Sequence, residues 1–165
     1  MSGDVRLSNS AISKIIAGAG PGLFGITGAA GSGKSYAGKL LCEQEKLALY
    51  SIDYRFIGDS LERLALLNRK QARSTADFQD SANQFNWWDW SAINHDLAEL
   101  TFGKEVVLES PYDRASGKKG NPLVILSAKK ILVEGALLGP PSLVEKLTKI
   151  FFLVTPQSVR FNRIM

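Results

Sequence analysis

The stretch Gly28-Ala29-Ala30-Gly31-Ser32-Gly33-Lys34-Ser35 matches the pattern G-x-x-x-x-G-K-[ST] at each fixed position. An apolar run at residues 23–27 precedes it and indicates a buried strand, and apolar residues follow it at helical spacing. Glycines between a strand and a helix let backbone N–H groups turn inward around a polyphosphate, and the helix N-terminus adds partial positive charge. The pattern therefore predicts a phosphate-binding loop of all eight residues, with Lys34 on the outer phosphates and Ser35 as a ligand of Mg²⁺. A flexible Gly/Ser turn is the alternative, and the strand–loop–helix context disfavours it.

The composition of the chain is that of one globular domain. It has 165 residues, of which 45% are hydrophobic and 22% charged. The net charge of +4 suits an anionic ligand such as a nucleotide, but it is too small and too scattered to indicate a nucleic-acid partner. No run approaches the roughly 18 apolar residues of a membrane span, and the N-terminus lacks a signal-peptide pattern. With the single cysteine, Cys42, these features predict a cytoplasmic protein without a membrane partner.

The periodicity of the apolar residues predicts alternating strands and helices. Residues 1–20 are expected to form an N-terminal helical extension, and residues 21–165 the core. Strands are expected at residues 23–27, 47–52, 106–110, 131–133 and 150–154, and helices after the loop, from 60, over 91–102, from 140 and from 156. Continuous apolar strands that alternate with helices are typical of an α/β fold. We therefore predict three layers, with a largely parallel sheet flanked by helices.

Two carboxylates follow predicted strands directly. Asp53 comes after the strand at 47–52, and Glu134 follows Val133. In parallel α/β sheets, ligands gather at the carboxyl ends of the strands. A carboxylate at the position of Asp53 could accept a proton from a substrate hydroxyl, and Glu134 could bind Mg²⁺ directly or through water. The structural alternative for each is a helix cap or a turn residue.

Arginine and aromatic side chains add two weaker signals. Arg160 and Arg163 are three residues apart on the last predicted helix and so share one face. Paired arginines there could clamp phosphates and neutralise transition-state charge, or they could simply form a solvated helix face. The aromatic segment at residues 85–90 could line a substrate pocket or pack against the flank of the sheet.

Taken together, these motifs resemble the uridine kinase and phosphoribulokinase family of phosphate-loop kinases. The matching stretches are Gly28 to Ser35, Ser51-Ile52-Asp53, Phe85-Asn86, Tyr112-Asp113-Arg114, Val133-Glu134-Gly135, and Arg160 with Arg163. The resemblance implies a P-loop NTPase fold with ATP and Mg²⁺ as cofactors. It implies that Asp53 is the catalytic base and contacts the metal, and that Ser35 and Glu134 complete the metal site. It also places Tyr112 in a substrate hairpin and the two arginines at the start of a lid.

The chain departs from the uridine kinase pattern at the positions expected to contact the nucleoside. Uridine kinases carry an aspartate for the sugar hydroxyls where this chain has Asn86, and a base-reading histidine roughly where it has Gly117. We therefore expect a small hydroxylated acceptor that is not assigned to a nucleoside. The candidate acceptor contacts are Asn86, Asp89, Tyr112 and Arg114.

The sequence is compatible with three functions. The first is an ATP-dependent small-molecule kinase, and the second is an ATP-binding module without transfer activity. A GTPase is the weakest, because Asn68 is followed by Arg69 rather than by the Lys of a guanine-reading motif, and Phe56 replaces a switch glycine. Family members continue past the paired arginines with a lid and a final strand, whereas this sequence ends at Met165. The expectation is an incomplete core that transfers phosphate slowly or not at all, with an uncovered sheet edge that favours a homo-oligomer.

Overall fold

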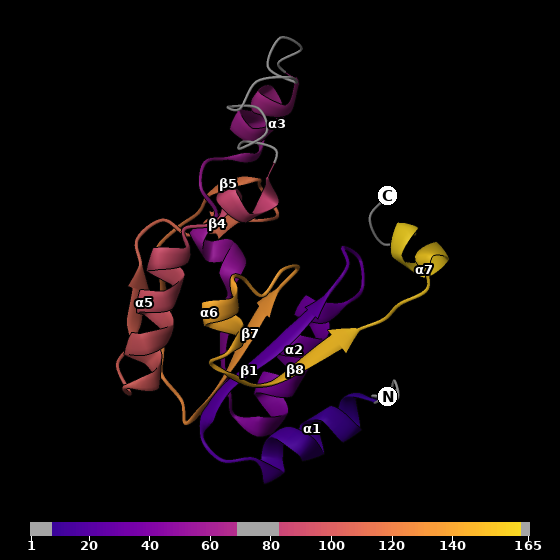
Figure 1. Cartoon of the computed structure of the whole chain (residues 1–165), viewed down its shortest axis with the longest axis vertical. Coiled ribbons are helices and arrows are strands. Elements are labelled where there is room, and N and C mark those ends of the chain that lie inside the picture. Colours follow the sequence, from indigo (N-terminus) through magenta and orange to yellow (C-terminus); the bar gives the residue numbers. More distant parts are fainter. Residues whose placement is uncertain (1–7, 69–82, 163–165) are drawn as a thin grey trace.

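The centre of the molecule is a sheet of four parallel strands in the order β2-β7-β1-β8 (Figure 1). The computed structural model describes residues 8–68 and 83–162. The strands are β1 (Gly22–Gly28), β2 (Ala48–Ser51), β7 (Lys130–Gly135) and β8 (Leu147–Leu153). Ser51 lies beside Glu134 and Thr27 beside Gly135, so neighbouring strands end at the same edge of the sheet. The predicted parallel sheet is therefore confirmed.

Helices cover both faces of this sheet. They are α1 (Asn9–Gly18) and α2 (Lys34–Glu45) on one face, and α5 (Trp90–Thr101) and α6 (Pro141–Val144) on the other. Side chains of β1 alternate between two hydrophobic clusters, with Leu23 packed in the cluster of α5 and Phe24 and Ile26 in that of α1 and α2. This alternation gives the three layers that the sequence predicts.

The N-terminal helix packs on the sheet. Ser8 caps α1 by accepting a hydrogen bond from the Ala11 N–H (3.2 Å), and Ile12 and Ile16 are buried in the same cluster as Phe24. At the other end of α1, Lys130 Nζ donates to the carbonyl oxygen of Ile16 (2.6 Å). The helix therefore shares the core of the sheet, and the division at residue 20 stays a prediction.

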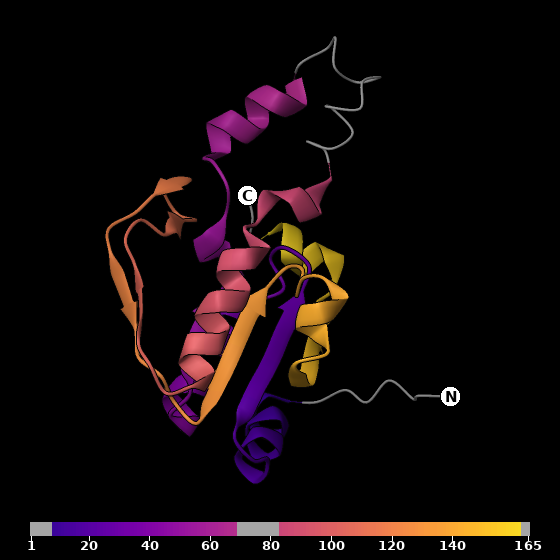
Figure 2. The same ribbon diagram turned by 60° about the vertical axis from the view of Figure 1, so that its left-hand side comes forward.

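An antiparallel hairpin lies beside α5, outside the parallel sheet (Figure 2). Its base pairs β3 (Val106–Leu108) with β6 (Leu123–Ile125), and its tip pairs β4 (Tyr112–Asp113) with β5 (Lys118–Lys119). The predicted strand at 106–110 thus forms, but as part of this hairpin. The reason is its pattern: Val106 and Leu108 face the core, whereas Val107 is exposed opposite exposed Val124.

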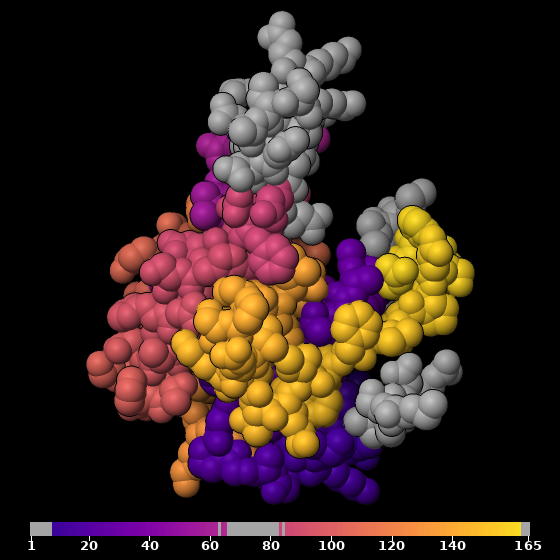
Figure 3. Space-filling model, viewed as in Figure 1, coloured from indigo at the N-terminus to yellow at the C-terminus, as the bar shows by residue number. Residues whose placement is uncertain are grey.

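Short elements complete the described chain. They are η1 (Ile52–Arg55), α3 (Ser60–Asn68), η3 (Gln84–Trp87) and α7 (Gln157–Phe161). The loop predicted at residues 70–85 lies largely outside the described residues. β8 forms an edge of the sheet and is at the surface in Figure 3. Phe152 of β8 and Val154 just after it are exposed. None of the helices in the described ranges is long and apolar enough to cross a membrane.

Candidate active site

The glycine-rich loop joins the end of β1 to the start of α2. Gly31 (φ +72°) and Gly33 (φ +89°) have left-handed backbones that favour glycine, and Gly33 is the N-cap residue of α2. The Ser32 N–H donates to Ala29 O (3.1 Å), which closes the loop. Thr155 Oγ1 donates to Ser32 O (2.9 Å), so the segment after β8 supports the loop from outside.

The glycine-rich loop is tightly packed at Gly28, and the hydroxyl of Ser32 is available to bind a ligand. A Cβ atom at Gly28 would lie 2.7 Å from Leu153 O and 2.8 Å from Ser32 Oγ, so only glycine fits there. Ser32 Oγ is buried, and it has no hydrogen-bond partner among the residues that the structure describes. A buried hydroxyl without a partner is costly. A bound anion at the N-terminus of α2 would supply the missing acceptor.

Lys34 is a buried cation at the first position of α2, with only 3% of its surface exposed. Burial lowers the pKa of its ammonium group, while the nearby carboxylates of Glu134 and Asp53 act in the opposite direction. Negative charge from a polyphosphate would stabilise the ammonium form further. Binding of the outer phosphates of a nucleotide by this loop stays a prediction, and the buried ammonium group is compatible with it.

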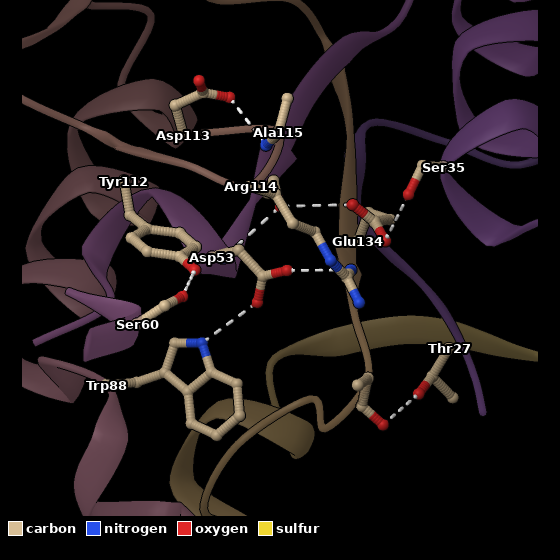
Figure 4. Close-up of polar contacts among 12 residues, drawn as sticks. Thr27, Ser35, Asp53, Ser60, Trp88, Tyr112, Asp113, Arg114, Ala115 and Glu134 are labelled. Atoms are coloured by element: carbon tan, nitrogen blue, oxygen red, sulfur yellow. Dashed lines mark hydrogen bonds and ion pairs between the residues drawn. The ribbon is translucent and has the colours of Figure 1, made fainter. Parts of the chain in front are cut away.

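Glu134 lies at the end of β7, between two serine hydroxyls. Ser35 Oγ donates to its Oε1 and Ser51 Oγ to its Oε2, both at 3.1 Å, and Glu134 is 5% exposed (Figure 4). The first contact places two predicted metal ligands together. The second contact comes from Ser51, which is not among the predicted site residues. Ser51 lies within the Ser51-Ile52-Asp53 motif, and its position opposite Glu134 depends on the pairing of β2 with β7.

Asp53 follows β2 in the short helix η1 and is 8% exposed. Trp88 Nε1 donates to its Oδ1 and an Arg114 guanidinium nitrogen to its Oδ2, both at 3.2 Å (Figure 4). Arg114, a predicted acceptor contact, forms an ion pair with Asp53, and its contact with an acceptor stays a prediction. Trp88 is buried in the hydrophobic core and also reaches the carboxylate. The aromatic segment thus both packs the core and contributes to the site.

A cavity of about 580 Å³ opens beside these groups. Five of the predicted site residues line it: Ser35, Asp53, Tyr112, Arg114 and Glu134. Further lining residues include Lys39, Leu49, Ser51, Tyr54, Asp113, Asn121 and Leu123. The sequence carries no signal for most of these further residues, because they meet only when the hairpin folds back beside α2 and β2.

The tip of the hairpin is fixed against the segment after η1. Tyr112 Oη and Ser60 Oγ are 2.8 Å apart, and the Ser60 N–H donates to Gly117 O (2.9 Å). Lys119 Nζ donates to Phe56 O (2.7 Å). The hairpin implied by the family resemblance is therefore present, and contact of Tyr112 with a substrate stays a prediction.

Other predicted site residues lie away from the cavity. Asn86 is exposed in η3, and Asp89 caps α5 by accepting from the Ala92 N–H (2.9 Å). Arg160 belongs to α7, where its Nε donates to Thr155 O (3.2 Å), and α7 lies apart from the hairpin in Figures 1 and 2. Arg163 lies outside the described residues. Roles for these side chains in substrate binding or catalysis stay predictions.

The oxygen ligands at this edge of the sheet suit Mg²⁺. Ser35, Asp53 and Glu134 offer a hydroxyl and two carboxylates, and Mg²⁺ is commonly bound by one or two carboxylates together with phosphate oxygens and water. Within the described ranges there is no group of three or more His, Cys, Asp or Glu side chains that could form a complete metal site from protein alone. A magnesium ion there would therefore share its coordination with a nucleotide.

Comparisons with known proteins place the chain by its fold. No protein-family model and no curated protein matches the sequence. The structure of a possible uridine kinase from Bacillus stearothermophilus is similar with a TM-score of 0.66 and 17% identity, over 94% of this chain and 84% of that one. A candidate fructose transport system kinase from Silicibacter sp. TM1040 is similar with a TM-score of 0.69 and 19% identity, over 96% of this chain and 80% of that one.

These likenesses establish the three-layer fold of P-loop NTPases for this chain. The predicted similarity to uridine kinase-like proteins is confirmed at the level of the fold, over nearly the whole sequence. A shared fold carries many chemistries, so the function must be argued from the site.

Proposed function

We propose that the protein is an ATP-dependent phosphotransferase that transfers the γ-phosphoryl group of ATP to a hydroxyl of a small molecule. One observation carries this proposal: the buried carboxylate of Asp53 lines the same cavity as Ser35 and Glu134, beside a phosphate-binding loop. A base candidate next to a phosphate loop is what phosphoryl transfer requires of a protein beyond positioning and charge neutralisation.

Each residue then has a defined task. The loop amides and Lys34 bind the phosphates of ATP, and Asp53 accepts the proton of the acceptor hydroxyl. The acceptor oxygen forms a bond to the γ-phosphorus as the bond from that phosphorus to the β,γ-bridging oxygen breaks, and ADP leaves. Ser35 and Glu134 would hold Mg²⁺, with Asp53 near it. When bound, the ion would neutralise charge on the phosphate oxygens.

The acceptor is expected to be a small hydroxylated compound bound in the 580 Å³ cavity. Nucleosides are poor candidates, because Asn86 is exposed outside the lining of the cavity and Gly117 has no side chain to read a base. A site built around such hydrogen bonds discriminates strongly when the partners are missing.

An assay of acceptor-dependent ADP formation tests the proposal. The protein is incubated with ATP and Mg²⁺ alone, and then with sugars, polyols, hydroxy acids and nucleosides in turn. At least one acceptor other than uridine or cytidine should raise ADP formation above the acceptor-free rate and yield a phosphomonoester detectable by ³¹P NMR. ATP binding without stimulation by any acceptor would contradict the proposal.

A second candidate function is an ATP-binding module without transfer activity. The ion pair between Arg114 and Asp53 favours it, because both oxygens of the proposed base already accept hydrogen bonds. The same acceptor assay separates the two candidates.

A cytoplasmic location and a homo-oligomer remain proposals. Burial raises the pKa of Cys42 to about 12, which suits an unreactive packed thiol in a reducing compartment.

A further inference from the structure

Asp96 is a buried carboxylate that contacts both ends of the segment carrying Asp53. Asp96 lies on α5 and is 2% exposed. Its Oδ2 accepts from Tyr50 Oη (2.7 Å) and from Arg55 Nε (2.7 Å), and its Oδ1 accepts from the Arg55 Nη2 group (2.8 Å). Tyr50 precedes Asp53 by a few residues and Arg55 follows it closely, so one side chain secures the segment on both sides.

The backbone just before α5 contacts the same segment. The Ile57 N–H donates to Trp87 O (2.8 Å), and the Asp89 N–H donates to Arg55 O (2.9 Å). These bonds flank an antiparallel bridge between Phe56 and Trp88. We call residues 87–96 the supporting segment. Through the Trp88 indole it also donates a hydrogen bond to Asp53 itself.

Asp96 forms a charge-assisted, bidentate pair with Arg55, which is one of the stronger polar interactions in proteins. A bidentate arginine–carboxylate pair gives both geometric specificity and strength, and a buried network with every member satisfied is rigid. Burial and the neighbouring Asp96 raise the pKa of Tyr50, so its hydroxyl remains a hydrogen-bond donor. Asp96 is not among the residues that line the cavity, so it is not placed to contact a substrate bound there.

We propose that Asp96 is a positioning residue for Asp53, an inference that rests on the proposed function. By binding Tyr50 and Arg55, Asp96 sets the position of η1 and therefore the distance from Asp53 to Ser35 and Glu134. Misplacement of a catalytic group by about 1 Å can lower the rate roughly 100-fold. Among the residues that the structure describes, Asp96 hydrogen-bonds to Tyr50 and Arg55 and not to the phosphate loop, so binding of ATP should not depend on it.

The test compares three variants of the whole chain. Asp96→Asn keeps the shape and removes the charge, and Tyr50→Phe removes one hydrogen bond while the ion pair with Arg55 remains. Glu99→Gln is the matched control, because Glu99 also lies on α5 and pairs with Lys104 (2.8 Å) at the surface. Three quantities are measured: kcat and KM for ATP with the best acceptor, and the amide hydrogen exchange of residues 52–57 relative to residues 28–37.

In Asp96→Asn, kcat should fall at least about tenfold, with KM for ATP within about twofold of the parent. Exchange should rise at residues 52–57 and not at residues 28–37, and Tyr50→Phe should show a smaller effect of the same kind. Unchanged exchange at 52–57, an equal rise along the whole chain, or a loss confined to KM would each overturn the proposal. If the parent transfers phosphate to no acceptor, the proposed function fails, and the exchange comparison still decides whether Asp96 positions η1.

Discussion

Lys34 is the only residue of the loop at 28–35 whose side chain carries a positive charge. Its ammonium group is buried, and a nucleotide would provide the anionic partner that burial demands. We expect Lys34→Ala to weaken binding of Mg²⁺–ATP by about 2–4 kcal/mol, as for a lost charge-assisted contact in a partly buried site. Isothermal titration measures this loss. Lys14→Ala removes an exposed lysine of α1 that does not line the cavity, and it should leave ATP binding nearly unchanged. An affinity of Lys34→Ala within twofold of the parent would rule out this role.

Asp53 should affect turnover far more than nucleotide binding. Asp53→Asn keeps the side-chain shape and removes the proton acceptor, so we expect kcat to fall by roughly 10²–10⁴ while ATP affinity changes little. Steady-state kinetics and calorimetry together check both statements. Asp113→Asn is the matched control, because Asp113 also lines the cavity while its oxygens accept from the N–H groups of Ala115 and Ser116. If Asp53→Asn keeps its turnover within tenfold of the parent, another group is the base.

The backbone conformation at the tip of the hairpin depends on Gly117. Its φ of +70° lies in the left-handed region, and a Cβ atom there would lie 3.0 Å from Ser60 Oγ. Gly117→Ala should therefore lower the free energy of unfolding by about 1–2 kcal/mol. Gly20→Ala is the control, because a Cβ at Gly20 meets no atom within 4 Å and needs no left-handed backbone. Urea denaturation of both variants measures the difference, and equal stabilities would show that the tip tolerates a side chain.

The sequence predicts some of these elements better than others for physical reasons. The phosphate loop is local, because its pattern and its shape lie within one turn between β1 and α2. The placement of Asp53 and Glu134 at one edge of the sheet could be predicted because each follows an apolar run: Asp53 comes shortly after β2, and Glu134 lies at the end of β7. Trp88 could not be placed, because its hydrogen bond to Asp53 depends on how the supporting segment packs beside η1. The same holds for Asp96, which in sequence is an ordinary polar residue of a helix.

At the scale of the whole molecule, α1 is part of the common core. Ile16 is fully buried in the cluster of Phe24 and Leu41. Ile16→Ala should lower the free energy of unfolding by about 2–4 kcal/mol and leave one cooperative transition. Ile15→Ala, on the half-buried side of the same helix, should cost less. Chemical denaturation followed by tryptophan fluorescence measures both. An unchanged midpoint for Ile16→Ala would mean that the helix is an independent extension.

The position of β1 in the sheet has a consequence for how the protein is made. β1 lies between β7 and β8, and its pairings begin at Lys130 and Leu147, far along the chain. A ribosome therefore releases the phosphate-loop sequence early, while the strand that supports it has no partner until both later strands have emerged. Contacts over such long separations form slowly, and an unpaired apolar strand is prone to aggregate in the meantime. We therefore expect a nascent chain to acquire ATP binding only late in its synthesis, and chaperones to matter most in the interval before then.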